Sequence, residues 1–142
     1  FADCLPVVIV GPGGFAVAHS GWRGTLAGIA GKTAAVLAGA CGCAPSELVA
    51  YLGPHISRAA YEVSQELLDT FESRFGTVAL GASRCLDLAG CVRASLGEAG
   101  VPSGRVWDAG LCTAAHTDRF FSHRMEEGKT GRHGAVAFMR AP

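Results

Sequence analysis

Two short apolar segments near the start of the chain constrain its fold more than any other feature. Residues 6–10 (PVVIV) and 15–18 (FAVA) are mostly β-branched, aromatic or small, and the four turn-forming residues Gly-Pro-Gly-Gly separate them. Apolar runs that flank such a loop are typical of two antiparallel strands joined by a turn. The sequence therefore predicts a β-hairpin at the start of the fold.

The hairpin brings a thiol and an imidazole together. With four loop residues, the strand register sets Pro6 opposite His19 and Cys4 opposite Gly21. Because side chains alternate between the two faces, Cys4 and His19 then lie on one face, roughly 7–8 Å apart between Cα atoms. Such a pair can ligate zinc or copper, or act as nucleophile and base. A structural interpretation, with a buried Cys4 and a satisfied strand-end His19, is equally open.

Composition limits the class of protein. Of 142 residues, 49% are hydrophobic and 17% are charged, which predicts a single core-forming domain over residues 1–142. The net charge is zero, and no basic run offers a surface for nucleic acid or an anionic membrane. No apolar stretch reaches the ~18–20 residues that span a bilayer, and no signal-peptide pattern opens the chain, so a cytoplasmic location is expected.

The six cysteines are scattered without a C-x-x-C pair, and a chain of this size does not need disulfides, so reduced thiols are expected. The close pair Cys41-Gly42-Cys43 falls in a Gly/Ala-rich stretch at a predicted helix end, which favours a structural role. The chain opens on Phe1 rather than on methionine and enters a strand within a few residues. This opening suggests a fragment of a longer protein.

Helical and strand patterns alternate after the hairpin. Apolar side chains recur at helical spacing in three segments that each begin at a capping residue, 25–40, 64–75 and 87–99. Three further segments are predicted as strands, 48–52, 105–108 and 134–139. A hairpin followed by this alternation predicts a mixed α/β class in which helices cover a sheet.

Arg23 lies between Gly21 and Gly24, at the turn from the second strand into the first predicted helix. Free N–H groups in the first turn of a helix favour an anion, and a guanidinium adds a bidentate donor. One interpretation is therefore a phosphate or carboxylate subsite beside the Cys–His pair. The other is a core Trp22 followed by a solvated or salt-bridged Arg23.

The C-terminal third holds a second group of polar motifs, at 112–113, 118–124 and 130–133. Strand alternation over 121–124 would place His123 and Arg124 on opposite faces. Residues 126–129 are predicted as a solvated turn between two strands. Arg132, which follows a glycine, can bind either an anion or a carboxylate of the fold.

Together these motifs resemble the multicopper polyphenol oxidoreductase (laccase-like) family, which is also described as purine nucleoside phosphorylases. The motifs are D-C-L-P, A-H-S-G-W-R-G-T, L-G-P-H-I followed by Y-E-V, C-T, F-F-S-H-R and T-G-R, over Phe1 to about Met139. The resemblance implies a sandwich of mixed sheets with helices packed outside, a cysteine-hydrolase-like (deamidase-like) architecture. It also implies a metal, usually zinc with copper possible, held by one cysteine and two histidines.

Cys4 and His19 match the family's cysteine and one of its histidines. The other family histidine normally lies upstream of D-C-L-P, so the third ligand is expected before Phe1, and the chain is expected to be the C-terminal part of a larger domain. Two ligands leave a zinc site incomplete. The alternative is that another histidine substitutes, and the candidates are His55, His116, His123 and His133.

The resemblance implies a purine nucleoside phosphorylase with adenosine deaminase activity. Its partners would be phosphate and adenosine, inosine or methylthioadenosine, and its products free base and ribose 1-phosphate. Such chemistry needs an anion site, a group that stabilises the departing purine and, for deamination, a metal-activated water. Cys4, His19 and Arg23 are the catalytic candidates. Arg23, Arg124 and Arg132 are the candidates for binding phosphate or ribose.

Three alternatives stay open. Cys4 and His19 could serve a hydrolase or amidase that acts on cell-wall peptides, provided that a neighbouring charge activates the thiol, whose free pKa is about 8.5. Copper-dependent phenol oxidation needs several histidine-rich sites, and five histidines offer one mononuclear site. The chain could also be an inactive binding fragment. The sequence does not define the oligomeric state.

Overall fold

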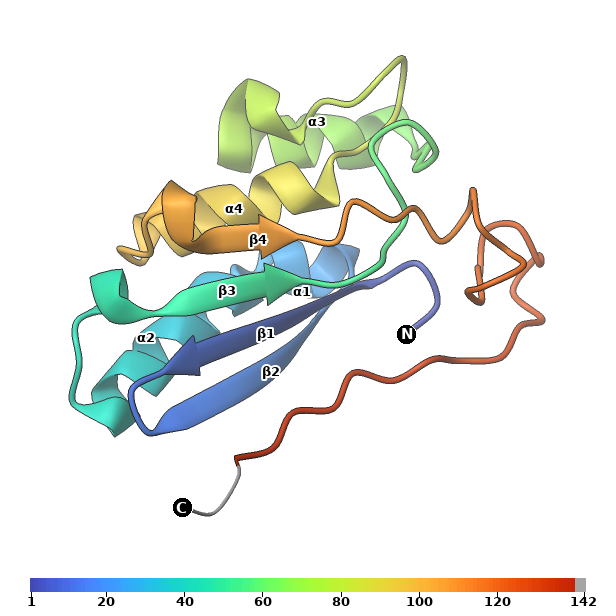
Figure 1. The fold of residues 1–142 in the computed structure, drawn as a ribbon. Coiled ribbons are helices and arrows are strands. Elements are labelled where there is room, and N and C mark those ends of the chain that lie inside the picture. The colour runs from blue at the N-terminus through green and yellow to red at the C-terminus, as the bar shows by residue number, and fades with distance from the viewer. Residues whose placement is uncertain (140–142) are drawn as a thin grey trace.

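A four-stranded mixed sheet organises the fold (Figure 1). A computed structural model describes residues 1–139 of the chain. The strand order is β2-β1-β3-β4, in which β1 pairs antiparallel with both β2 and β3, and β3 pairs parallel with β4. The strands are β1 (Leu5–Gly11), β2 (Gly14–Ser20), β3 (Val49–Leu52) and β4 (Val106–Asp108).

In the described residues, four α-helices and three short 3₁₀ helices connect and cover these strands. The α-helices are α1 (Trp22–Leu26), α2 (Ile29–Cys41), α3 (Gln65–Phe75) and α4 (Leu88–Glu98). The 3₁₀ helices are η1 (Pro45–Glu47), η2 (Gly76–Ala79) and η3 (Ser103–Arg105). None of the helices in residues 1–139 is long and apolar enough to cross a membrane.

The hairpin has the predicted register. Pro6 pairs with His19, and the pairing continues to Gly11 opposite Gly14, so the connecting turn contains only Pro12 and Gly13. Gly13 has a φ of 78°, which glycine adopts without the steric cost that other residues pay. The two glycines counted as loop residues in the sequence therefore extend the strands by one pair.

The single helix predicted over 25–40 is wrong, because the chain forms two helices with a break at Gly28. Gly28 has a φ of 72°, and α2 begins only at Ile29. Thr25 does not cap a helix. It is 1% exposed inside α1, and its hydroxyl is hydrogen-bonded to that of Ser20 at 2.8 Å. A tertiary contact thus occupies the side chain that the sequence pattern offered as a cap.

The two later helices begin where their capping residues predict. Ser64 Oγ accepts a hydrogen bond from the Leu67 N–H at 3.3 Å, and Asp87 Oδ1 accepts one from the Gly90 N–H at 2.8 Å. Such side-chain acceptors satisfy N–H groups that have no partner within the helix. Gly42 ends α2 in the left-handed region, with a φ of 62°, so the Cys41–Cys43 pair lies at a helix end as predicted.

The strands predicted near the C-terminus are wrong. Residues 121–124 begin a series of turns, in which the Glu126 carboxylate accepts the Ser122 N–H at 2.8 Å and Ser122 Oγ accepts the Met125 N–H at 3.2 Å. The turn predicted over 126–129 forms part of a longer turn at 123–128, but no strand flanks it in the described residues. Residues 134–139 run as an extended segment with no strand beside them in the described chain. Alternating side chains alone do not make a strand without a neighbour to accept its hydrogen bonds.

The helices pack on one face of the sheet and leave the other face open. Buried residues from β1, β3, α2 and α4 form the main core, while α3 packs with α4 in a second cluster around Phe71. The opposite face of the sheet exposes four large apolar side chains, Val10, Val17, Tyr51 and Trp107, which are 38–62% exposed. The mixed α/β class with helices on a mixed sheet is confirmed. A second sheet of a sandwich does not occur within residues 1–139.

Two glycines of α2 offer a matched test of its packing against α4. A Cβ at Gly31 would lie 2.5 Å from the Ser95 carbonyl oxygen, whereas nothing lies within 4 Å of that position at exposed Gly39. We expect Gly31→Ala to lower the free energy of unfolding by about 1–3 kcal/mol through overpacking. Gly39→Ala should raise it by about 0.5–1 kcal/mol, because alanine favours the helix. Urea unfolding followed by circular dichroism measures both, and equal effects would contradict the close approach.

Candidate active site

One cavity of about 580 Å³ gathers every side chain that the sequence singled out for catalysis or binding. It lies where the hairpin passes into α1, and residues from the C-terminal turns close it on another side. The predicted residues that line it are Cys4, His19, Arg23, Arg124 and Arg132. Residues more than 100 positions apart in the chain therefore share one site.

The thiol and the imidazole converge beside Gly21. Cys4 directly precedes β1, and His19 is the next-to-last residue of β2. A Cβ at Gly21 would lie 2.9 Å from Cys4 Sγ and 3.9 Å from His19 Nε2, so both atoms border the same point. Only a residue without a side chain leaves this space free. The register argument made from the sequence thus corresponds to a real proximity of the two donor groups.

The surroundings of both groups disfavour charge. Burial raises the pKa of the Cys4 thiol, the Asp3 carboxylate raises it further, and the N-terminal ammonium and Arg132 oppose these effects. Burial and the N-terminal ammonium lower the pKa of His19. A Cys–His nucleophile would need a lowered thiol pKa. A metal ligand also needs the thiolate form, so the raised pKa of Cys4 does not separate the two interpretations, whereas the lowered pKa of His19 favours the neutral imidazole that binds a metal.

The chemical types of the two donor atoms, a sulfur and an imidazole nitrogen, suit zinc or copper. One sulfur and one imidazole nitrogen are ligands that both ions accept. Within residues 1–139, however, no group of three or more His, Cys, Asp or Glu side chains is close enough to hold a metal ion. None of the four substitute histidines therefore completes a three-residue site in this part of the chain.

The ring of Phe1 lies 4.6 Å from that of His19 and 6.3 Å from that of His133.

The surroundings of Arg23 differ from those that the sequence predicted. It lies in α1, whose five residues are too few for a strong helix dipole, so the predicted anion site at a helix start is reduced to the guanidinium itself. This guanidinium stacks 4.1 Å above the centre of the Trp22 ring. Trp22 also packs at the edge of the second apolar cluster and lines the cavity. The stacking holds a positive charge at the cavity wall.

The other two arginines come from the C-terminal turns. Arg124 donates from its backbone N–H to Asp3 Oδ2 at 2.8 Å and from its guanidinium to the Glu62 carbonyl at 2.6 Å. Within residues 1–139, the Arg132 guanidinium donates to the backbone carbonyls of residues 130 and 131. His123 lines the same cavity as Arg124. The predicted placement of these two residues on opposite faces is wrong, because the segment is a turn and not a strand.

Sequence reasoning missed Asp3 and Tyr61. Asp3 is 7% exposed, has a φ of 78° and accepts a hydrogen bond from Thr113 Oγ1 at 2.7 Å as well as the one from Arg124. Tyr61 lines the cavity, and burial together with the Cys4 thiol raises its pKa. Both residues belong to motifs that carry the family resemblance, D-C-L-P and Y-E-V. Membership in these motifs was the one sequence signal for Asp3 and Tyr61. It did not show whether either residue serves the site or only the fold.

Comparisons with known proteins identify the family of this chain. Residues 1–140 match the family described as multi-copper polyphenol oxidoreductase laccase. Purine nucleoside phosphorylase YlmD of Bacillus subtilis is 34% identical over an alignment of 140 residues that covers 93% of this chain and 50% of the relative. A purine nucleoside phosphorylase of Homo sapiens is 33% identical over an alignment of 131 residues that covers 86% of this chain and 30% of the relative. The chain spans half or less of these relatives.

Solved structures show the same fold. The hypothetical protein YfiH from Bacillus licheniformis matches with a TM-score of 0.83 and 34% identity, over 92% of this chain and 52% of that one. YlmD from Geobacillus stearothermophilus matches with a TM-score of 0.79 and 33% identity over the same shares. The match to the family covers almost the whole sequence, and relatives and structures agree with it. The chain therefore belongs to the multicopper polyphenol oxidoreductase (laccase) family.

Proposed function

We propose that this chain supplies the larger part of the active site of a cytoplasmic, zinc-dependent purine nucleoside phosphorylase. The enzyme would cleave adenosine, inosine and methylthioadenosine with phosphate, and would also deaminate adenosine. The convergence of Cys4, His19 and three arginines in one cavity carries the proposal. The names of the relatives support it, since they are purine nucleoside phosphorylases.

The cavity suits a nucleoside and phosphate in size and chemistry. Its volume of about 580 Å³ is within the usual range of small-molecule sites. Guanidinium groups bind phosphate oxygens in bidentate fashion, so Arg23, Arg124 and Arg132 are proposed to hold phosphate and the ribose. Trp22 and Tyr61 offer aromatic surface for the purine base. Their flat rings favour stacking with another aromatic system.

Cys4 and His19 are the proposed ligands of the zinc ion, and copper is the alternative ion for the same pair. When bound, zinc acts as a Lewis acid and lowers the pKa of a coordinated water to about 7. Cys4 is partly buried and His19 is exposed, so the proposed ligands lie at an open wall of the cavity. The arginines supply positive charge where phosphate binds, so that the anion and the nucleoside are held next to each other.

We also propose that these residues form the C-terminal part of a larger domain. The chain covers 50% of the length of the Bacillus subtilis relative. The exposed apolar side chains on the open face of the sheet, together with Phe138 at 77% exposure, would be covered by the remaining part. The same part would provide the third metal ligand.

The test compares the chain alone with a version extended at its N-terminus to the length of the relatives. We expect the extended protein to bind about one zinc ion per chain and to release base from inosine and adenosine only when phosphate is present. The chain alone should bind zinc weakly and lack this activity. An extended protein that holds zinc but cleaves no purine nucleoside would refute the proposed activity.

Gly21 tests the geometry of the metal site. Alanine at this position suits the backbone, whose φ is −78°, but its Cβ would lie 2.9 Å from Cys4 Sγ. We therefore expect Gly21→Ala in the extended protein to lower the zinc affinity by roughly 10–100-fold, as disturbed ligand geometry does in other sites. Gly39→Ala is the matched control and should bind zinc normally. Zinc titration against a chromophoric chelator distinguishes the two, and an unchanged affinity in Gly21→Ala would contradict the arrangement.

A further inference from the structure

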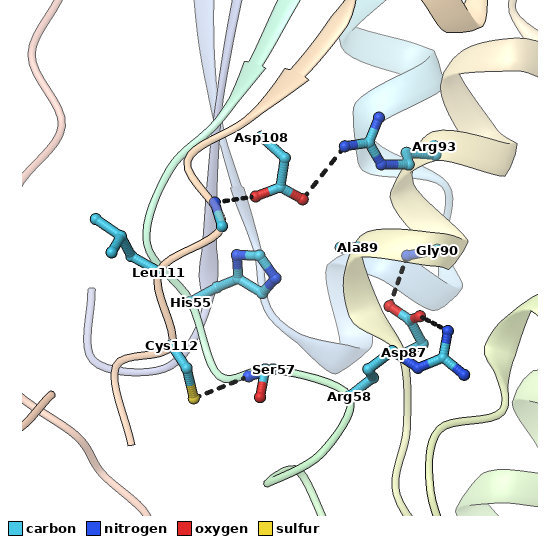
Figure 2. A pocket seen from close by; sticks show the side chains of 11 residues that line it. His55, Ser57, Arg58, Asp87, Ala89, Gly90, Arg93, Asp108, Leu111 and Cys112 are labelled. Carbon is cyan, nitrogen blue, oxygen red and sulfur yellow. Dashed lines mark hydrogen bonds and ion pairs between the residues drawn. The ribbon is translucent and has the colours of Figure 1, made fainter. Parts of the chain in front are cut away.

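The carboxylates of a second cavity, of about 280 Å³ beside the start of α4, are paired with arginines (Figure 2). Asp87 lies 3.5 Å from Arg58, and Asp108 lies 3.3 Å from Arg93. Asp87 also accepts the Gly90 N–H in the first turn of α4 at 2.8 Å. These contacts belong to the packing of α4, and they give both carboxylates a structural role. Buried polar atoms without a partner lie in another part of the chain.

Both ring nitrogens of His133 lack a partner. Within residues 1–139 they are the buried side-chain nitrogen or oxygen atoms that no hydrogen bond reaches. The ring has two aromatic neighbours, Phe1 at 6.3 Å and Phe120 at 5.8 Å between ring centres. A buried polar group without a partner is costly unless a further molecule or segment of chain satisfies it. The imidazole of His133 therefore indicates a contact with a group outside the described residues.

The backbone of the same histidine pairs with Phe1. The Phe1 nitrogen donates to the His133 carbonyl at 2.5 Å, and the His133 N–H donates to the Phe1 carbonyl at 2.9 Å. Two residues that exchange both hydrogen bonds form the hydrogen-bonded pair of an antiparallel ladder. This pair fixes a direction. Chain that precedes Phe1 would continue the ladder along residues 134–139.

Residues 134–139 already have the form of a strand. Ala135 and Ala137 are partly buried, whereas Val136 and Phe138 are 88% and 77% exposed. Alternation with a period of two is typical of a strand. The run GAVAFM has no polar side chain on either face, and short runs of this kind are typical of strands that are covered on both faces. What the segment lacks, within residues 1–139, is a neighbouring strand.

The start of this segment lies over the open face of the sheet. His133 and Gly134 line a cavity of about 400 Å³ together with Tyr51 and Trp107 of that face. Tyr51 is 49% exposed and Trp107 is 62% exposed. Figure 1 shows the N-terminus next to the same segment. A strand that pairs with 134–139 would therefore belong to a second layer, which would bury the apolar side chains of the open face.

We propose that the segment immediately before Phe1 in the longer protein is a strand antiparallel to residues 134–139. This rests on the proposed place of the chain in a larger domain. The Phe1–His133 pair sets the register, because successive residues pair in opposite directions. The residue two before Phe1 lies opposite Ala135 as a hydrogen-bonded pair. The residue three before Phe1 lies opposite Val136 as a non-hydrogen-bonded pair, and the new layer supplies the partner of the His133 ring.

Disulfide crosslinking in the N-terminally extended protein tests this register. Cysteine replaces Val136 and the residue three before Phe1, whose Cα atoms would lie ~4.5 Å apart, within the usual ~4.4–6.8 Å of a disulfide. The control carries the second cysteine four before Phe1, on the other face of the strand. We expect the first variant to form at least roughly tenfold more of the crosslinked peptide by mass spectrometry. Equal crosslinking, or more in the control, would overturn the proposal.

Hydrogen exchange tests the same pairing without a substitution. The Ala135 and Ala137 N–H groups should exchange at least roughly 100-fold more slowly in the extended protein than in the chain alone. Equal exchange in the two proteins would refute the strand. Protection in the chain alone that grows with its concentration would assign the segment to a second copy and also refute the proposal. Neither measurement depends on zinc or on nucleoside cleavage, so a crosslinked, protected but inactive protein would refute the proposed activity alone.

Discussion

Replacing Cys4 with serine in the N-terminally extended protein is expected to remove bound zinc and to reduce phosphate-dependent cleavage of inosine by about 100-fold or more. Serine has nearly the same size, but its hydroxyl stays protonated at neutral pH and is a poor zinc ligand. The other proposed ligand, His19, cannot hold the ion with only the upstream residue. Zinc content by elemental analysis and initial rates of base release give the two measurements.

Cys43→Ser is the matched control, since Cys43 is also a partly buried thiol but lies at the end of α2, away from the cavity. It should keep full zinc and activity. The Cys4 variant should retain the thermal unfolding profile of the zinc-free protein, which separates loss of the ligand from loss of the fold. A Cys4→Ser protein with normal zinc content and normal rates would exclude Cys4 as a ligand.

Replacing Asp3 with alanine is expected to lower the free energy of unfolding by about 3–8 kcal/mol. The change leaves two donors without an acceptor, the buried Thr113 hydroxyl and the Arg124 N–H, and each such loss costs about 1–3 kcal/mol. Alanine at a φ of 78° adds about 1–2 kcal/mol of backbone strain. Urea unfolding measures the total.

Asp3→Asn separates the two contributions. Asparagine tolerates positive φ and keeps one acceptor oxygen, but its amide group faces a donor, so we expect a smaller loss of about 1–3 kcal/mol. Phosphate affinity should fall in both variants as well, because the Asp3 carboxylate holds the backbone of Arg124 at the cavity. Equal stability of the alanine variant and the parent protein would show that Asp3 does not anchor the C-terminal turns.

Local patterns predicted the parts of the fold that depend on near neighbours in sequence. The hairpin register followed from turn residues and alternation, and Ser64 and Asp87 marked two helix starts correctly. The prediction of Thr25 as a helix cap failed because its hydroxyl is hydrogen-bonded to the Ser20 hydroxyl instead. The strand predicted over residues 134–139 does not form. A strand needs a partner strand, and the alternation of side chains does not show whether a partner is present.

In the candidate site, too, contacts between residues close in sequence were predictable and contacts between distant residues were not. Cys4 and His19 were predictable as neighbours, since the four-residue loop counted in the sequence gives the same strand register as the two-residue turn in the structure. Arg124 is held beside them by hydrogen bonds to Asp3, 121 positions away, and to the Glu62 carbonyl. Spacing along the chain cannot reveal such a contact. The order of motifs indicated which residues belong together, but not that a turn, rather than a strand, presents them.

The strand order has a practical consequence for handling the protein. β2 is an outer strand of the sheet, so one row of its backbone N–H and C=O groups faces outward within the described chain. Val17, on this strand, is 41% exposed, and the neighbouring open face is apolar. Unprotected edges of this kind template pairing with other molecules. Preparations of residues 1–142 alone should therefore form edge-to-edge aggregates at high concentration, and a charged substitution such as Val17→Lys should delay them.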